Sequence, residues 1–446
     1  MSAGGKGLII LAFIVCSSAV VVAKPAESFQ VQKAVQGWLR SGDNAFGITL
    51  GRHSADITVY IDANKEPLYY IVHLRPSGFV IVAADDEVEP IIGFSGSGSF
   101  DPSSQNPLRV LVTRDLPKRI ANARKVKISS VSTEKNKKVS REATKWAALQ
   151  LLADSSAVMS ISVLSDIRVS PLMQSQWNQG TVCDNNCYNY YTPNNYKCGC
   201  VATAMAQLMR FHCHPAGAVG TAAFTIYVNG VNQTASLRGG DGVGGPYIWD
   251  QMPLIPDCST TAAQYQAIGT LCHDAGIVIN TNYGQHVSTA PVRDAKNALI
   301  TTFQYTGGVY GSNGGQNIGE NLIEMINPNL DAGYPVILSI GGDEHSVVAD
   351  GYGYDLTTLY HHINMGHSGI DDTWYNLPDF DYPYNDIVDG CIYNLYVTGS
   401  GEIISGRVTT SYGAPISDVM ITATANGNVY TAVTNSHGIY ALVKVP

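Results

Sequence analysis

The sequence predicts an α+β protein built from more than one domain. Its 446 residues are enough for several hydrophobic cores. The chain is 45% hydrophobic and 14% charged, which is typical of a folded protein and excludes a largely disordered one. Helical and strand-like patterns both occur along it. We expect a small α+β domain first, then a larger mixed domain, and then a β-rich segment at the end.

Residues 1–23 have the pattern of a signal peptide. Lys6 supplies a positive charge, Gly7–Val15 is mostly apolar, and Val21-Val22-Ala23 offers small residues for cleavage. The alternative is a membrane anchor. No other stretch is apolar and long enough to cross a bilayer, so we expect a secreted, extracellular protein without stable membrane association.

Residues 24–125 are predicted to form the small α+β domain. Pro25–Arg40 has apolar residues at roughly helical spacing. Four strand-like runs follow, separated by turn-forming residues: Ile57–Ile61, Leu68–Leu74, Phe79–Ala83 and Ile91–Phe94. A helix followed by several antiparallel strands is typical of a small α+β domain.

Residues 126–168 are expected to form a basic linker that contains a maturation site. Arg114–Lys145 holds 11 of the 27 Lys and Arg residues, and Ser129–Ser140 has almost no large apolar side chain. We expect cleavage between about Val126 and Val169; the alternative is a solvated helix surface or loop.

Charge divides the chain into a basic leader and an acidic body. Up to Lys145 there are 19 Lys and Arg against 13 Asp and Glu, and from Trp146 onward 8 against 23. We expect the leader to dock on the body partly through this difference. The acidic body makes nucleic acid an improbable partner.

Residues 169–400 are predicted to form the larger mixed domain, and residues 401–446 change in character. The last segment has four β-like runs: Ile403–Thr409, Val419–Ala425, Val429–Val433 and Tyr440–Val445. They resemble the opening strands of a carboxypeptidase regulatory-like β-sandwich. Such a sandwich usually has about seven strands, so we expect an incomplete or minimal β domain.

Cys200 is the first candidate for chemistry. Gly199 permits a tight turn, and the Ala- and Met-rich run from Val201 predicts a helix that begins at this cysteine. A helix N-terminus lowers a thiol pKa and favours the nucleophilic thiolate. The alternative is a cysteine of the core or of a disulfide.

Three further residues complete a candidate site. His345 follows a Gly-rich turn at the start of a predicted strand, where an imidazole can accept a thiol proton. Asn364 ends another strand and could orient that imidazole. Gln179, in Gln176–Gly180, could donate to an oxyanion beside the Cys200 N–H. Taken singly, each is equally consistent with a polar loop or surface residue.

Cysteine number allows two other interpretations. Eight cysteines follow Cys16, and in an oxidising compartment some should pair, although spacing does not give the pairs. Zinc binding by Cys183, Cys187, Cys198 and Cys200 is the weaker alternative, because one residue between ligands is cramped for a tetrahedral site. We expect no metal or cofactor.

Several motifs together resemble the streptopain family (C10) of papain-fold cysteine peptidases. The order Gln179, Cys200, His345, Asn364 is that of papain-like proteases. The matching segments are Gly199–Met209 at the nucleophile, Gly78–Gly93 in an inhibitory prodomain, Pro171-Leu172 and Trp177-Asn178-Gln179 at the start of the mature enzyme, Tyr247–Pro253 and Gly351–Asp355.

This resemblance implies a papain-like peptidase domain and a zymogen. Cys200 matches the nucleophile, His345 the base and Gln179 the oxyanion donor, while Asn364 matches the Asn of the family's Asn-Trp-Gly-Trp segment. It implies hydrolysis of protein or peptide substrates through an acyl-enzyme, with the prodomain as an intramolecular inhibitor.

The chain departs from the family pattern at several positions. Met365 and His367 replace two tryptophans, one of which shields the histidine in the family. Asp343 and Glu344 precede His345 and are expected to raise its pKa, and Cys198 adds a thiol near the nucleophile. These departures motivate the alternative of a catalytically impaired, peptide-binding or adhesion protein.

Overall fold

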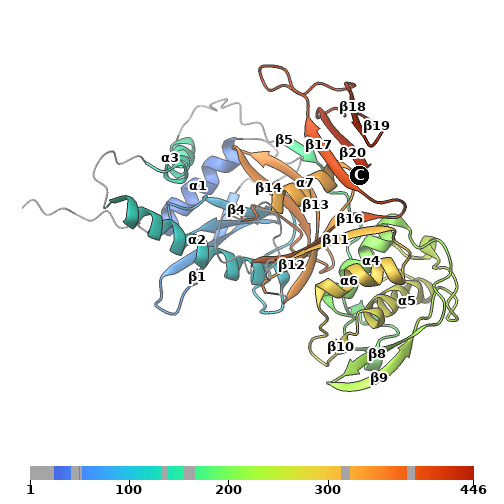
Figure 1. The fold of residues 1–446 in the computed structure, drawn as a ribbon. Helices are drawn as coiled ribbons and strands as arrows, with labels where there is room; N and C mark the ends of the chain where they lie inside the picture. The colour runs from blue at the N-terminus through green and yellow to red at the C-terminus, as the bar shows by residue number, and fades with distance from the viewer. Residues whose placement is uncertain are drawn as a thin grey trace, which may run out of the picture.

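A computed structural model describes residues 25–41, 50, 53–131, 139–154, 166–312, 322–342, 344–378 and 387–446 (Figure 1). The expected signal peptide, residues 1–23, and Asp343 lie outside these residues. So do residues 132–138 and 155–165 of the expected linker.

The leader forms the expected helix and strands, and two further helices follow them. Its elements are α1 Ser28–Ser41, β1 His53–Ile61, β2 Pro67–Arg75, β3 Phe79–Ala83, β4 Ile91–Ser95, α2 Pro107–Val131 and α3 Arg141–Asp154. Strands β1 to β4 form an antiparallel meander. Alternate residues of β2 face opposite sides of this meander. Tyr69 and Ile71 join the core that contains α2, while Tyr70 and Val72 join the core that contains α1 and α3.

The larger domain has a helical part and a sheet part. The helical part contains α4 Cys200–His212, α5 Ala262–Val278, α6 Val292–Thr301, the small strands β6 Thr181–Val182, β7 Asn185–Asn186, β8 Ala223–Val228, β9 Val231–Ser236 and β10 Asn282–Tyr283, and the short 3-10 helices η2 Pro193–Asn195 and η3 Trp249–Gln251. The sheet part contains β5 Asp166–Val169, β11 Gly307–Ser312, α7 Leu322–Asp331, β12 Val336–Ile340, β13 His345–Asp355, β14 Thr358–Asn364, β15 Thr373–Tyr375 and β16 Val388–Tyr396.

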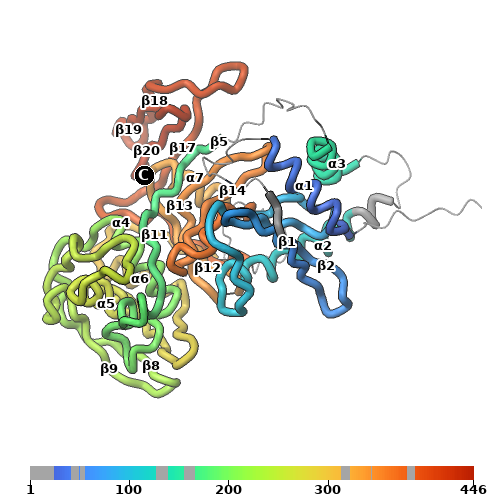
Figure 2. Tube along the Cα trace, turned by 180° about the vertical axis from the view of Figure 1, so that it is seen from behind, coloured from blue at the N-terminus to red at the C-terminus, as the bar shows by residue number. Residues whose placement is uncertain are grey.

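One antiparallel sheet runs through both domains, in the order β1-β2-β3-β4-β15-β14-β13-β12-β16-β11, with β5 beside β13. The two domains join where β4 pairs with β15, Phe94 opposite Trp374 and Gly93 opposite Tyr375. Seen from behind, helices α4 to α6 and helices α1 to α3 lie at opposite ends of this sheet (Figure 2). The pairing β12-β13-β14 brings the candidate histidine and asparagine into neighbouring strands.

Helix α3 differs from the expected linker, because it is packed. Trp146, Leu149 and Leu152 are buried against α1 in one core with Trp38. The basic residues around them hid this helical spacing in the sequence. The segment 126–168 therefore contains a structural helix of the leader.

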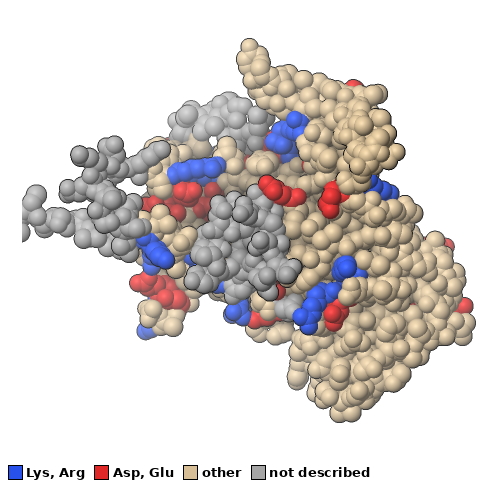
Figure 3. Space-filling view, in the orientation of Figure 1, with Lys and Arg blue, Asp and Glu red and all other residues tan. Residues whose placement is uncertain are grey.

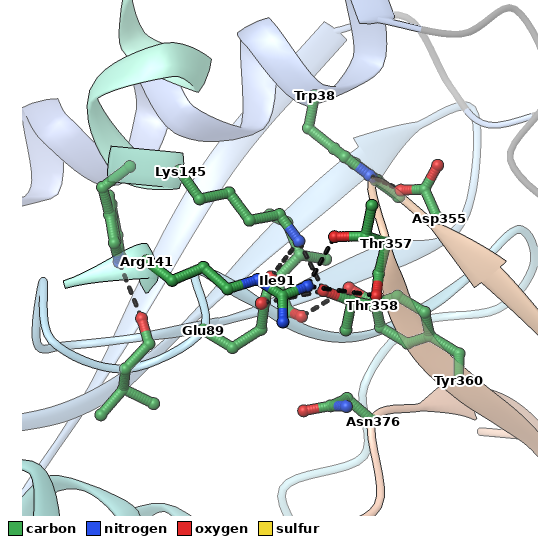
Figure 4. A network of polar contacts seen from close by, with 12 residues as sticks. Trp38, Glu89, Ile91, Arg141, Lys145, Asp355, Thr357, Thr358, Tyr360 and Asn376 are labelled. Atoms are coloured by element: carbon green, nitrogen blue, oxygen red, sulfur yellow. Dashed lines mark hydrogen bonds and ion pairs between the residues drawn. The ribbon is translucent and has the colours of Figure 1, made fainter. Parts of the chain in front are cut away.

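A buried polar network joins the leader to the turn between β13 and β14 (Figure 4). Trp38 donates its indole N–H to Asp355 at 2.6 Å. Lys145 of α3 bridges Glu89 and Thr358, and the Thr358 hydroxyl donates to Glu89 at 2.9 Å. We call the contact made by these five residues the outer contact.

The last segment forms two β ribbons, β17 Glu402–Arg407 with β20 Ile439–Val445 and β18 Met420–Ala425 with β19 Asn428–Val433. Arg407 donates to both carboxylate oxygens of Asp166 at the start of β5. Ser405 donates to Asp331 of α7 at 2.6 Å. The segment is thus attached to the larger domain. None of the helices in the described ranges has the length and apolar character that a membrane crossing requires.

Candidate active site

Cys200 is the first residue of the buried helix α4. The preceding Gly199 has φ of 96°, and a Cβ there would lie 3.1 Å from the Ser288 carbonyl oxygen. Both the left-handed backbone and the close approach require glycine. Residues Val201 to Met209 are all buried, so the helix start is fixed by packing on every side.

Three backbone N–H groups influence the Cys200 thiol. Its own N–H and those of Val201 and Ser346 act to lower the pKa of the thiol. Burial has the larger influence and raises this pKa above its ordinary value. The expected low thiol pKa is therefore wrong for the chain with its leader in place, because desolvation outweighs the helix N-terminus.

His345 begins β13 directly before Ser346, opposite Ile340 of β12. Its Nδ1 atom is buried and has no hydrogen-bond partner among the described residues. Gly341 and Gly342, with φ of 71° and 76°, form the turn that returns the chain to this position. Since the Ser346 backbone lies near the Cys200 sulfur, the start of β13 is adjacent to the candidate nucleophile.

The charge state of His345 also differs from the expectation. Burial lowers the pKa of its imidazole, Glu344 acts in the opposite direction, and His367 and Lys197 lower it further. The expected rise in pKa is wrong because burial of the imidazole outweighs the effect of the Glu344 carboxylate. A raised thiol pKa and a lowered imidazole pKa both favour an uncharged Cys200–His345 pair in this form.

Gln179 lies in a loop next to Cys198-Gly199-Cys200, which we call the nucleophile turn. Its carbonyl oxygen accepts from the Cys198 N–H at 2.9 Å, and its own N–H donates to the side-chain oxygen of Asn178 at 2.7 Å. These bonds hold the Gln179 backbone beside Cys198-Gly199-Cys200. Its side chain is partly buried.

Asn364 has partners other than the imidazole. Its Oδ1 accepts from the side chain of Gln207 and from the Gly366 N–H, both at 3.0 Å, and its Nδ2 donates to the Ser175 carbonyl at 2.8 Å. With both lone pairs of Oδ1 occupied, it has no free acceptor for His345. The expected orienting role is not what this arrangement shows: Asn364 joins β14 to α4 and to the segment before Trp177.

Gln207 is a site residue that the sequence reasoning missed. It is 1% exposed, and its Oε1 accepts from the Ser175 hydroxyl and the Trp177 N–H. The signal was present, because Gln207 is a polar residue in the buried run Val201–Met209, where Thr203 is the other polar residue. Buried amides in such positions need partners and thereby fix their neighbours.

Leader residues cover the region around His345. Arg114 pairs with Glu344, Asn106 donates its side-chain N–H to Asp371, and Arg119 donates to both oxygens of Asn376. A Cβ at Gly341 would lie 2.5 Å from the Val110 side chain, so α2 lies directly on the β12–β13 turn. We call these contacts, together with the Asp101 N–H donating to Asp371 at 3.4 Å, the site contact.

The two residues that replace the family tryptophans have different environments. Met365 is 1% exposed and belongs to the core. His367 is partly buried, and burial lowers its pKa while Asp101 of the leader opposes this shift. His367 is therefore the polar member of the pair and lies within electrostatic range of His345.

Cysteine pairing is partly settled by the structure. Cys183 and Cys258 form a disulfide, which removes Cys183 from the zinc alternative. The other six described cysteines carry no disulfide in this structure: Cys187, Cys198, Cys200, Cys213, Cys272 and Cys391. Across the described part of the chain, no group of three His, Cys, Asp or Glu side chains is arranged to hold a metal ion.

A second ionisable cluster lies at the boundary of the two domains. A cavity of about 450 Å³ is lined by Ser95–Ser97 of the leader and by His362, Asp372 and Trp374, among others. Burial raises the pKa of Asp372 to about 7. Burial alone would lower the pKa of His362, but the Asp350 carboxylate raises it above its ordinary value. No local pattern predicted this cluster, because Asp350 and His362 lie on the neighbouring strands β13 and β14 and Asp372 lies just before β15.

Comparisons with known proteins agree with this arrangement. Residues 177–375 match the Peptidase C10 family, and residues 23–116 match the Spi protease inhibitor family. Streptopain of Streptococcus pyogenes is 25% identical over 328 residues, which cover 69% of this chain and 73% of that protein. The thiol protease/hemagglutinin PrtT of Porphyromonas gingivalis is 24% identical over 318 residues, 70% of this chain and 34% of that protein.

The fold has a solved counterpart. A fragment of Prevotella intermedia prointerpain A, carrying a cysteine-to-alanine substitution, superposes with a TM-score of 0.53 at 19% identity, over 76% of this chain and 98% of that fragment. At this identity the likeness concerns the fold alone. Taken together with the family matches, the observations show that the chain is a streptopain-like cysteine peptidase of the C10 family that carries an inhibitor-type prodomain.

Proposed function

We propose that the chain is a secreted cysteine endopeptidase made as a zymogen. Cys200 attacks the carbonyl carbon of a peptide bond, and His345 takes the thiol proton and returns it to the leaving amine. The Cys200 N–H and the Gln179 side-chain amide stabilise the oxyanion. Protein or peptide substrates and the chain's own prodomain are its partners.

The observation that carries this proposal is the set of backbone N–H groups around one sulfur. The thiol at the start of α4 receives N–H groups from Val201 and from Ser346, the neighbour of His345. A structural cysteine needs no such donors, whereas a thiolate nucleophile is stabilised by them. The donors are therefore a reason to assign chemistry to Cys200 in particular.

Asn364 enters the proposal in a changed role. Because its Oδ1 is bonded to Gln207 and Gly366, we assign it to positioning the loop that carries Met365 and His367. In this role it acts through the walls of the site and not through the imidazole.

Latency follows from the site contact. Arg114 neutralises Glu344, the neighbour of His345 that raises its pKa, and α2 packs on the turn that carries His345. Removal of the prodomain returns water and the Glu344 charge to the site. Both changes favour the thiolate–imidazolium pair.

Export is proposed from two features. Residues 1–23 have the pattern of a signal peptide, and the Cys183–Cys258 disulfide is typical of an oxidising compartment. Within the chain we assign 24–125 to the prodomain, 126–168 to the segment cut on maturation, 169–400 to the peptidase domain and 401–446 to an attached β segment.

The packing of α3 narrows the position of the maturation cut. A cut before α3 would leave that helix packed on α1 and still joined to the peptidase domain. A cut after Val169 would break β5, which is paired with β13 and bonded to Arg407. We therefore expect the N-terminus of the mature enzyme between Asp154 and Asp166. N-terminal sequencing checks this, and a start at Arg141 or earlier would contradict it.

Cleavage of casein by the purified full chain, before and after limited proteolysis, tests the function. We expect activity to appear on nicking, to survive a chelator, and to fall by at least about 10³-fold in Cys200→Ala. Cys213→Ala, which removes an exposed free thiol, is the control and should retain activity. Activity that persists in Cys200→Ala would refute the assignment of the nucleophile.

A further inference from the structure

Three buried free thiols lie beneath the nucleophile turn. Cys187, Cys198 and Cys272 are each fully buried, and they belong to one core cluster with α4 and α5. Cys198 is two residues before Cys200, whereas Cys272 lies on α5. None of the three takes part in the proposed reaction, so the cluster needs another explanation.

Helix α5 presents one face to the nucleophile turn. A Cβ at Gly276 would lie 3.6 Å from the Cys198 carbonyl oxygen, and Cys272 lies one helical turn earlier on the same face. A Cβ at Gly269 would lie 2.6 Å from the Cys187 carbonyl oxygen. Gly269 thus allows α5 to approach the Cys187 backbone closely, and at Gly276 the helix lies at ordinary contact distance from the Cys198 carbonyl. Cys272 lies between these two positions.

The contacts single out one pair of thiols. Burial raises the pKa of Cys272 well above its ordinary value, and a hydrogen bond with the Cys198 thiol adds to this shift. Burial likewise raises the pKa of Cys187, but Cys198 affects it only through charge. Together with the shared core cluster and the approach of α5, this makes the Cys198 and Cys272 side chains neighbours.

The existing disulfide crosslinks the same two segments. Cys183 precedes Cys198 in one segment, and Cys258 precedes Cys272 in the other by nearly the same spacing. Formation of Cys183–Cys258 requires oxidising conditions, to which Cys198 and Cys272 are exposed in the same folding chain.

We infer that Cys198 and Cys272 form a second disulfide, which fastens the turn before Cys200 to α5. The two thiols lose two electrons and two protons to a disulfide oxidant, which is reduced to two thiols: one thiolate attacks the oxidant to give a mixed disulfide, and the other displaces it. Because both groups are buried afterwards, exchange takes place before α5 packs on α4.

The crosslink would act on the geometry of the site. The Cys198 N–H donates to the Gln179 carbonyl, and the Cys198 carbonyl side of the turn leads directly to Gly199 and Cys200. Fixing the Cys198 side chain to α5 thus restrains both the oxyanion loop and the nucleophile turn. The inference does not depend on the role proposed for Cys200, since it can be tested in a chain without that thiol.

Peptide mapping of the full chain with Cys200→Ala tests the crosslink. The protein is alkylated in denaturant without reduction and digested with trypsin. Trypsin gives Cys198–Arg210 with Cys198 as its remaining cysteine, and Gly239–Arg293 with Cys258 and Cys272. We expect Cys198–Arg210 to be disulfide-linked, together with Val169–Lys197, to Gly239–Arg293.

A Cys187–Cys198 disulfide would link the same three peptides and give the same mass as Cys198–Cys272. Two further variants, each made in the Cys200→Ala chain, distinguish these two disulfides. Cys198–Arg210 should stay linked in Cys187→Ala and be released in Cys272→Ala. If Cys272→Ala does not fold, retention of the link in Cys187→Ala decides in favour and its loss decides against. An alkylated, unlinked Cys198 in the parent chain, with Cys183–Cys258 intact, would overturn the inference.

Discussion

The prodomain meets the peptidase domain at two places that differ in character. At the outer contact, α1 and α3 reach the β13–β14 turn through buried groups, and Lys145 and Glu89 are 13% and 15% exposed (Figure 4). At the site contact, α2 approaches the His345 turn through an Arg114–Glu344 pair whose side chains are both 45% exposed. Deeper in the same contact, Arg119 is 13% exposed and Asp115 fully buried.

This difference indicates a division of roles. Buried, multiply bonded groups are costly to separate, whereas an exposed ion pair contributes about 0–1 kcal/mol. The outer contact and Arg119 therefore provide most of the docking stability. The exposed part of the site contact acts chiefly on the charge next to His345. On the face shown in Figure 3, basic and acidic side chains are interspersed.

The largest effect is expected at the buried end of the site contact. Arg119→Met removes the cation that pairs with the fully buried Asp115 carboxylate. Among the described residues of the peptidase domain, the Tyr375 hydroxyl remains as its donor, at 2.7 Å. Uncompensated burial of a charge costs about 3–5 kcal/mol. We expect a fall of this size in the free energy of unfolding of the full chain carrying Cys200→Ala.

Arg114→Met is the matched control for this change. Both arginines lie on α2 and both contact the peptidase domain, but Arg114 is exposed, so its loss should cost about 1 kcal/mol or less. Equal effects of the two substitutions in urea unfolding would contradict the distinction between the buried and exposed parts of the site contact.

A smaller effect is expected at the outer contact. Trp38→Phe keeps most of the apolar contact but removes the N–H that donates to Asp355. Burial raises the pKa of Asp355 and this hydrogen bond opposes the shift, so its loss at pH 8 should cost about 2 kcal/mol.

Trp146→Phe is the control, because its indole N–H donates to the backbone carbonyl of Val88 within the leader. Its loss should cost about 1 kcal/mol. If Trp38→Phe were no more destabilising than Trp146→Phe, the outer contact would not have the strength assigned to it.

The third effect depends on pH. Burial raises the pKa of Asp371 to about 6, and the side chain of Asn106 lowers it. An acid whose pKa is raised on folding stabilises the fold less as pH rises from about 4 through 6. Asn106→Ala removes the donor and raises this pKa further. We therefore expect it to destabilise the full chain by about 1 kcal/mol more at pH 8 than at pH 4.5.

Thermal unfolding at both pH values checks this prediction. Asn64→Ala, on an exposed turn of the leader, is the control and should show no such difference. If Asn106→Ala destabilised the chain equally at both pH values, the contribution of Asn106 would not depend on the ionisation of the Asp371 carboxylate.

Much of the fold could be predicted because the signals are local. Strand β3 has the predicted bounds, α4 begins at Cys200, and β13 begins at His345. Each depends on an apolar pattern and a glycine turn within a few residues. The spacing of Trp146, Leu149 and Leu152 also indicates a helix with one buried face, but the high charge of the surrounding segment led us to predict a linker.

The rest of the site depends on long-range contacts that no local pattern encodes. Asn364 is bonded to Gln207, which lies 157 positions away in the chain. The pairing of β4 with the three-residue strand β15, and the shift of the Cys200 pKa by burial, likewise depend on which segments pack together. Sequence order identified the residue types of the site, whereas their partners and charge states required the structure.

The rate at which iodoacetamide alkylates Cys200 tests the central claim most directly. It is measured at pH 7 by peptide mass spectrometry, in the full chain and after limited proteolysis, with Cys213 as the internal reference. We predict that Cys200 reacts slowly in the full chain and at least about tenfold faster after nicking, because the thiol becomes hydrated and pairs with His345. An unchanged rate after the prodomain has dissociated would contradict a latent cysteine nucleophile at this position.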